Sequence, residues 1–145
     1  MMTLETIQTR FREIASKLGS PTAIPTARQD DGSAHAEHVG KTYFYVVTER
    51  GTEYLRRQTS DPDELLSWFV RDLTSAIALS WELENRIPAQ DFRRLYFRKH
   101  VELLQAINQS WANQQQAEYD AVLAKHPFDD EASARLDRLK RSQIE

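Results

Sequence analysis

Several side chains have the types and spacing that binding or catalysis would require, and most of them lie in the run ENRIPAQDFRRLYFRKH, from Glu84 to His100. Five basic and three aromatic residues stand in this run, and a histidine ends it. Exposed arginines among aromatic residues are typical of nucleic-acid recognition, whereas buried arginines hold carboxylates through paired hydrogen bonds. Which of these two chemistries applies depends on the element that carries the residues.

A helix predicted from about Ala89 to Ile107 divides the basic residues between its two faces. Arg93 and His100 fall within the apolar stripe of this helix. We therefore expect Arg93 to point inward, toward a carboxylate such as Asp72 or Glu82, because the guanidinium fork can bind a carboxylate twice. His100 is expected to make a hydrogen bond at the edge of the core rather than to act as a general base.

The polar side of the same helix offers only Arg94, Arg98 and Lys99 to an anionic partner. Tight binding to a phosphate backbone needs many such contacts, because its strength rises steeply with their number. The whole chain also has a net charge of −3. We therefore expect no nucleic-acid partner.

The preceding helix, predicted from Pro62 to about Asn85, carries a lone carboxylate within a wide apolar arc. Asp72 falls there among large apolar side chains, where an unpaired charge would cost several kcal/mol, so it should be paired or protonated. Residues 61–85 hold six acidic residues and one basic residue, and residues 86–109 hold five basic and two acidic residues. The simplest interpretation is that the acidic and basic segments face each other.

Other polar residues do not form a convincing catalytic or metal-binding constellation. His35 and His38 stand three positions apart on a predicted strand, where their side chains point to opposite faces, and no third ligand has a suitable spacing. The sequence has no phosphate-binding loop, nucleophile elbow or zinc-protease motif. We expect no catalytic residues, no cofactor and no metal. The alternative is a small-ligand or enzymatic pocket formed by Asp72, Arg93 and His100.

The composition is that of one folded domain, expected to span residues 1–145. The chain is 40% hydrophobic and contains no cysteine, which excludes disulfides and thiolate metal sites. No apolar run approaches the roughly 20 residues needed to cross a bilayer, and nothing resembles a signal peptide. These features predict a cytoplasmic protein with no membrane partner.

The pattern of apolar and turn residues predicts an α+β fold. We expect an N-terminal helix over residues 3–18, capped by Thr3 and ended by Gly19, and a β meander over about 33–59. The meander should contain strands near 33–39, 41–49 and 52–59, with Gly51 at a positive φ. The helical part, about 62–141, should form a bundle of three or four helices beside a small antiparallel sheet of about three to four strands.

Local signals also predict where the later helices begin. Asp61 is the expected N-cap of the long helix, with Pro62 in the first turn and Glu64 completing a capping box. Ser110 is expected to cap the helix that follows the one predicted from about Ala89 to Ile107. A last short helix should turn Leu136 and Leu139 inward. Pro88 is expected to break the chain between the two long helices only weakly.

Two groups of residues are candidates for binding a protein partner. The central strand is apolar on both faces, so Tyr43 and Tyr45 either lie in a sandwich or form an exposed aromatic face. Asp61, Asp63 and Glu64 are capping residues first, and they are also a candidate acidic patch for a basic partner. A possible homodimer would associate through the aromatic face of the sheet.

The second half of the chain resembles the immunity proteins of bacterial polymorphic toxin systems, specifically the immunity protein 63 family. The resemblance covers roughly residues 41–130, includes the segment ERGTEYLRR, and depends most on the linked elements QDFRR and HPFDD. Pro88 departs from the family pattern. The other matching features are Asp63-Glu64-Leu65-Leu66, Trp68, Asp72, Glu82-Leu83, Arg86 and Glu102-Leu103-Leu104.

This resemblance implies a protein without enzymatic activity that binds a cognate toxin domain and neutralises it by a stoichiometric protein–protein interaction. It also implies a polar network within the motif, formed by Asp72, Glu82, Arg86, Asp91, Arg93 and Arg94. An acidic immunity protein would suit a basic toxin domain, such as a nuclease. The alternative function is a structural or regulatory interaction module.

Overall fold

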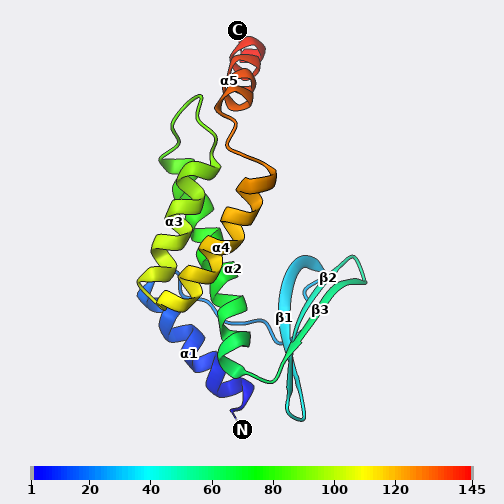
Figure 1. Cartoon of the computed structure of the whole chain (residues 1–145). Coiled ribbons are helices and arrows are strands. Elements are labelled where there is room, and N and C mark those ends of the chain that lie inside the picture. Colours follow the sequence, from blue (N-terminus) through cyan, green and yellow to red (C-terminus); the bar gives the residue numbers. More distant parts are fainter. Residues whose placement is uncertain (1, 145) are drawn as a thin grey trace. The chain divides into compact units, whose positions relative to one another are not determined.

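The computed structural model describes residues 2–144 and confirms the α+β fold predicted from the sequence (Figure 1). This part of the chain contains five helices and one three-stranded antiparallel sheet. It divides into two compact units, the first ending at Leu73 and the second beginning at Thr74, both within one long helix. That residues 1–145 behave as a single domain stays a prediction. No helix among the described residues has the length and hydropathy needed to span a bilayer.

The first unit begins with helix α1, Leu4–Lys17, at the predicted position. Thr3 caps it by accepting a hydrogen bond from the amide of Thr6, and Gly19 follows the helix at φ 73°. The buried face of α1 carries Ile7, Phe11 and Ala15, in the predicted helical spacing. The helix therefore forms where its caps and apolar periodicity indicate.

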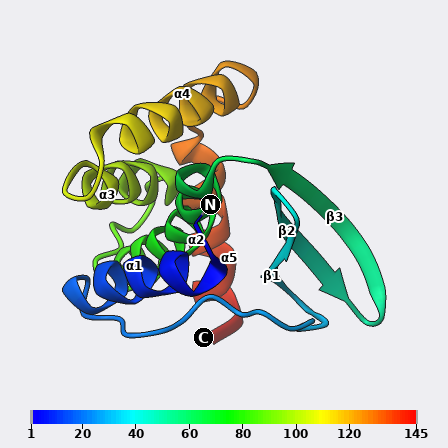
Figure 2. The same cartoon turned by 90° about the horizontal axis from the view of Figure 1, so that it is seen from below.

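The sheet is a meander of β1, Asp31–Val39, β2, Thr42–Glu49, and β3, Thr52–Thr59. Arg50 and Gly51 both have positive φ, 51° and 80°, which is the geometry of a tight hairpin and confirms the prediction for Gly51. Both strand pairs contain an irregularity of register, and the second lies between Val47 and Thr48. Figure 2 shows β3 as an outer strand of the sheet, and all but the last of its residues are exposed.

Helix α2, Pro62–Glu84, begins where its cap predicts. Asp61 accepts a hydrogen bond from the amide of Asp63, whereas its own amide donates to the Thr59 hydroxyl. The expected capping box with Glu64 is therefore wrong. The apolar arc is also narrower than predicted, because Leu83 is 65% exposed at the far end of the helix. The buried residues of α2 are the run from Leu65 to Val70 and then Thr74, Ala78 and Glu82, which follow at intervals of four residues.

In the second unit, α2 ends at Glu84, and eight residues separate it from the start of helix α3, Arg93–Gln105. The predicted start at Ala89 is wrong, because Ala89 has φ 63° and residues 85–92 form a loop around Pro88. The two long helices are thus clearly separated. The amide of Ala89 donates to Asp137 in helix α5, Asp130–Ile144.

Helix α4, Gln109–Lys125, is capped by Asn108, whose side chain accepts a hydrogen bond from the amide of Trp111. Ser110 is therefore not the cap that the sequence predicts. Helix α5 is capped by Asp129, which accepts from the amide of Ala132. Leu136 and Leu139 are 57% and 61% exposed, so the prediction that they turn inward is wrong.

His100 lies in the core of the second unit and is 2% exposed. Its Nε2 is 2.8 Å from the Thr74 hydroxyl, and its Nδ1 is 2.5 Å from the Tyr119 hydroxyl. The ring also stacks on Tyr96. A buried histidine with both ring nitrogens in hydrogen bonds is a structural element of the core, in agreement with its predicted role.

Candidate functional site

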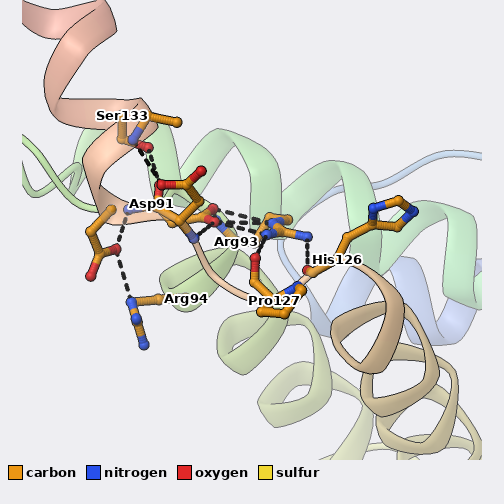
Figure 3. A network of polar contacts seen from close by, with 9 residues as sticks. Asp91, Arg93, Arg94, His126, Pro127 and Ser133 are labelled. Carbon is orange, nitrogen blue, oxygen red and sulfur yellow. Dashed lines mark hydrogen bonds and ion pairs between the residues drawn. The ribbon is translucent and has the colours of Figure 1, made fainter.

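The polar network of the second unit centres on an ion pair between Asp91 and Arg93 (Figure 3). Asp91 stands two residues before α3, and Arg93 is the first residue of that helix. The guanidinium Nη2 lies 2.9 Å from Asp91 Oδ2, and Nε lies 3.2 Å from both carboxylate oxygens. The side chains of Arg93 and Asp91 are 20% and 8% exposed. Arg93 is thus held by a carboxylate, but its predicted partners, Asp72 and Glu82, are wrong.

Arg93 also binds the chain between α4 and α5. Its Nη1 donates to the carbonyl of His126 and its Nη2 to the carbonyl of Pro127, both at 2.9 Å. These carbonyls follow the end of α4, where orphan acceptors need partners. Arg93 therefore joins the start of α3 to the end of α4, so that the QDFRR and HPFDD elements form one structural clamp.

The carboxylate of Asp91 also joins the start of α3 to the segment between α4 and α5. It accepts hydrogen bonds from the amide of Arg93, two residues further along, at 3.0 Å and from the amide of Asp129 at 2.9 Å. Burial alone raises the pKa of Asp91, but the hydrogen bonds from the Arg93 guanidinium and from these two amides outweigh it and lower the pKa to about 2. Asp91 is therefore ionised at neutral pH.

Arg94 forms the outer edge of the same network. Its Nε donates to Asp130 Oδ1 at 3.0 Å, and that oxygen also accepts from the amide of Asp91 at 2.8 Å. The side chains of Arg94 and Asp130 are 40% and 45% exposed, which agrees with the predicted outward position of Arg94. Figure 3 shows the guanidinium groups of Arg93 and Arg94 pointing in different directions. The sequence did not indicate Asp130 as the partner of Arg94.

Glu82 and Arg86 form a separate ion pair at the end of α2. Arg86 binds both carboxylate oxygens of Glu82, at 2.9 and 2.8 Å. Glu82 is 1% exposed, whereas the Arg86 side chain is 43% exposed. A buried carboxylate is thus neutralised by an arginine four residues further along the chain. The charge of Glu82 is therefore neutralised by a residue close to it in the sequence, and Arg93 takes no part in this pair.

In the first unit, the carboxylate of Asp72 accepts a hydrogen bond from the Tyr45 hydroxyl, at 2.6 Å. Partial desolvation raises the pKa of Asp72, against the lowering effect of the hydrogen bond from Tyr45. The hydrogen bond agrees with the expectation that this carboxylate has a partner, but Asp72 as a whole residue is exposed and does not lie deep in the apolar arc. Tyr45 packs against Trp68 and Phe69 of α2, with ring centres 6.0 and 5.1 Å away.

The partner-binding candidates occupy different environments. Asp61 caps α2, and Asp63 forms an ion pair with Arg10 of α1 at 2.5 Å, while Glu64 is exposed. Tyr43 is fully buried and its hydroxyl donates to the carbonyl of Met2, so its ring does not form an exposed aromatic face. Partner binding by Asp61, Asp63, Glu64 and Tyr45 stays a prediction.

The three residues of the alternative pocket each have partners of their own. Asp72 accepts from Tyr45, Arg93 holds Asp91 and two carbonyls, and His100 bonds Thr74 and Tyr119. The histidines of β1 are partly engaged, since His35 Nε2 lies 2.7 Å from Glu37 and His38 stacks on Tyr43. Within the described residues, His35 Nδ1 and His38 Nε2 are buried without a hydrogen-bond partner. Residues 2–144 contain no group of three or more side chains placed to hold a metal ion.

Taken together, the described residues form an α+β protein whose strongest polar site joins chain segments to one another. Comparison with known protein families identifies the family of the chain. Residues 40–121, more than half of the 145 residues, match the family described as immunity protein 63, and the chain belongs to that family. No curated protein and no solved structure matches the chain. The family match confirms the resemblance over a segment that includes QDFRR, whereas HPFDD, residues 126–130, lies beyond the matched residues.

Proposed function

We propose that this protein binds a cognate toxin domain and neutralises it as a stoichiometric complex in the cytoplasm of the bacterium that produces the toxin. Membership of the immunity protein 63 family is the observation that carries this proposal. The organisation of the polar residues supports it. Asp91 and Arg93 join the start of α3 to the chain after α4, and Arg86 neutralises the buried Glu82 at the end of α2, which gives a rigid scaffold for binding a partner.

The proposal assigns no reaction to the protein. The carboxylates of Asp91 and Glu82 are bound by arginines of the same chain, so these ion pairs act by holding loops and helix ends in place. Inhibition would then follow from occupying or covering the toxin's active site, which needs a complementary surface and no catalytic group. Neutralisation should accordingly require one immunity protein for each toxin molecule and should not continue after the inhibitor is consumed.

The test is to express the toxin gene that neighbours the gene for this chain, with and without the chain, in a sensitive host. Survival only when both are present, and a purified complex of one-to-one mass by light scattering, are expected. The variant Arg12→Ala changes an exposed residue of α1 outside the polar network, and it should protect the host as well as the wild-type chain does. Death of the host at equal expression of both proteins would refute the proposal.

A further inference from the structure

A groove of about 400 Å³ runs between α3 and α4 in the second unit. Four apolar side chains line it, and two arginines stand on the same lining. The apolar residues are Phe97, Val101, Leu123 and Phe128, and the arginines are Arg94 and Arg98. The groove thus combines an apolar surface with two arginine side chains, and apolar surface with a few polar groups is the usual make-up of a specific binding site.

The aromatic part of the groove is rigidly packed. Phe97 stacks on Tyr119 of α4, with ring centres 3.7 Å apart and planes 10° from parallel. Phe128 lies further along, with its ring centre 6.5 Å from that of Phe97. Because Phe128 belongs to the HPFDD segment that Arg93 holds, the Asp91–Arg93 clamp also positions one wall of this groove.

Arg94 is held in place, but most of its hydrogen-bonding capacity is unused. Its Nε binds Asp130, and its guanidinium carbon lies 4.2 Å from the centre of the Phe128 ring. Within residues 2–144, neither Nη atom of Arg94 donates to a protein acceptor. A guanidinium fixed on one edge and stacked on an aromatic ring is pre-organised to bind an anionic group with its remaining donors.

Arg98 stands one helical turn further along α3 and is exposed. In the part of the chain that the structure describes, it forms neither an ion pair nor a side-chain hydrogen bond. The acidic residue nearest in the groove lining is Glu102, whose side chain is 64% exposed and lies 3.6 Å from Lys99. Arg94 is paired with Asp130 and Glu102 with Lys99, so the positive charge that the groove retains is that of Arg98, although the whole chain has a net charge of −3.

The geometry points to this groove as the docking site for an acidic peptide segment of a protein partner, in which carboxylates alternate with apolar side chains. The carboxylates would bind Arg94 and Arg98, and the apolar side chains would lie over Phe97 and Phe128. The inference rests on the proposed function only for the identity of the partner as the toxin. It reverses the charge expected from the sequence, which favoured a basic partner.

Two features favour an acidic peptide over a nucleic acid. Only two arginines of the groove have donors available, and phosphate backbones are held by many contacts at once. Glu102 also stands among the lining residues and would repel a continuous row of phosphates, whereas a peptide can place a neutral residue opposite it.

The first experiment uses the full chain and a fluorescein-labelled peptide of alternating glutamate and leucine, followed by fluorescence anisotropy. Arg98→Ala and Arg94→Ala should each weaken binding by about tenfold, the loss expected for a charge-assisted hydrogen bond. Glu102→Gln should strengthen it by about twofold, because a repulsive charge is removed. Arg12→Ala, with an exposed arginine on α1, should change nothing.

The inference is overturned if the acidic peptide does not bind, if a matched peptide with lysine in place of glutamate binds equally well, or if a single-stranded oligonucleotide binds more tightly. Loss of binding in Glu102→Gln would also contradict it, since that variant leaves both arginines in place. Circular dichroism of each variant shows whether the fold is intact. Arg98→Ala is the decisive variant because Arg98 forms no ion pair or side-chain hydrogen bond with the described residues.

The second experiment repeats the series with the toxin encoded beside the chain. A toxin that binds the wild-type chain and Arg98→Ala equally well would overturn the groove as its docking site and leave the proposed function standing. A chain that binds the acidic peptide through Arg98 and does not bind the toxin would refute the proposed function and leave the groove as a docking site for another partner. The two ideas are thus separable.

Discussion

The acidic start of α2 and the basic start of α3 look alike in the sequence, as short charged clusters beside long helices, and the structure treats them differently. At α2, Asp61 is a cap and Asp63 is paired with Arg10. At α3, Arg93 is mostly buried and bound to Asp91, Arg94 is bound to Asp130 through Nε, and Arg98 is exposed. Whether a charged side chain is available to a partner therefore depends on which side chains and carbonyls of distant segments already bind it.

The same comparison separates ion pairs by their energetic role. The Arg93–Asp91 pair is 20% and 8% exposed, whereas Arg10–Asp63 is 41% and 60% exposed. Exposed pairs contribute about 0–1 kcal/mol because water screens them and ordering the side chains costs entropy. Breaking a buried pair costs more, because it leaves an uncompensated charge. Stability should therefore depend on the clamp, and the acidic start of α2 should contribute little.

The largest predicted effect comes from breaking the clamp. Arg93→Met should lower the free energy of unfolding by about 3 kcal/mol, at the lower end of the range for a buried pair, because two backbone amides still bind Asp91. The neighbouring Arg94→Met should lower it by less than about 1 kcal/mol, because its pair with Asp130 is exposed. Urea unfolding followed by circular dichroism measures both, and equal losses would contradict the comparison.

A smaller effect should appear on acidification. The pKa of Asp91 is lowered to about 2 in the folded chain, so its pairing stabilises the fold above the ordinary aspartate pKa near 3.8. This contribution is lost as the pH falls through that value toward 2, and about 1 kcal/mol should be gone by pH 3. The stability difference between the wild type and Asp91→Asn should narrow by that amount between pH 6 and pH 3. A difference that is constant or grows on acidification would mean that Asp91 is not held ionised by the clamp.

These contrasts explain which parts of the molecule could be predicted from the sequence. The helix α1, the hairpin at Gly51 and the start of α2 at Pro62 depend on caps, turn residues and periodicity that lie within a few residues of each other. The inward position of Arg93 follows from the same helical periodicity. Local patterns of this kind carry enough information to define an element and the direction of a side chain.

The partner of Arg93 could not be predicted in the same way. Periodicity gives a direction on a helix but does not say which segment lies there, and the acceptors of Arg93 come from a residue before α3 and from carbonyls beyond α4. Backbone carbonyls have no sequence signature at all. For Leu136 and Leu139 the pattern again predicted an inward face, and the two side chains are exposed because the periodicity does not say what would cover them.

The smallest predicted effect concerns the acidic start of α2, and it tests directly whether this surface or that of α3 binds the partner. If Asp63 and Glu64 steer a basic partner, the double variant Asp63→Asn, Glu64→Gln should slow association with the toxin, because steering depends on net local charge. Arg10 offsets one of the negative charges of Asp61, Asp63 and Glu64, so the local field is weaker than three carboxylates would give. We therefore expect the stopped-flow association rate to change by no more than about twofold. A decrease of about tenfold would show that the acidic cluster guides the partner after all, and it would favour the acidic start of α2 over the α3 groove as the surface where binding begins.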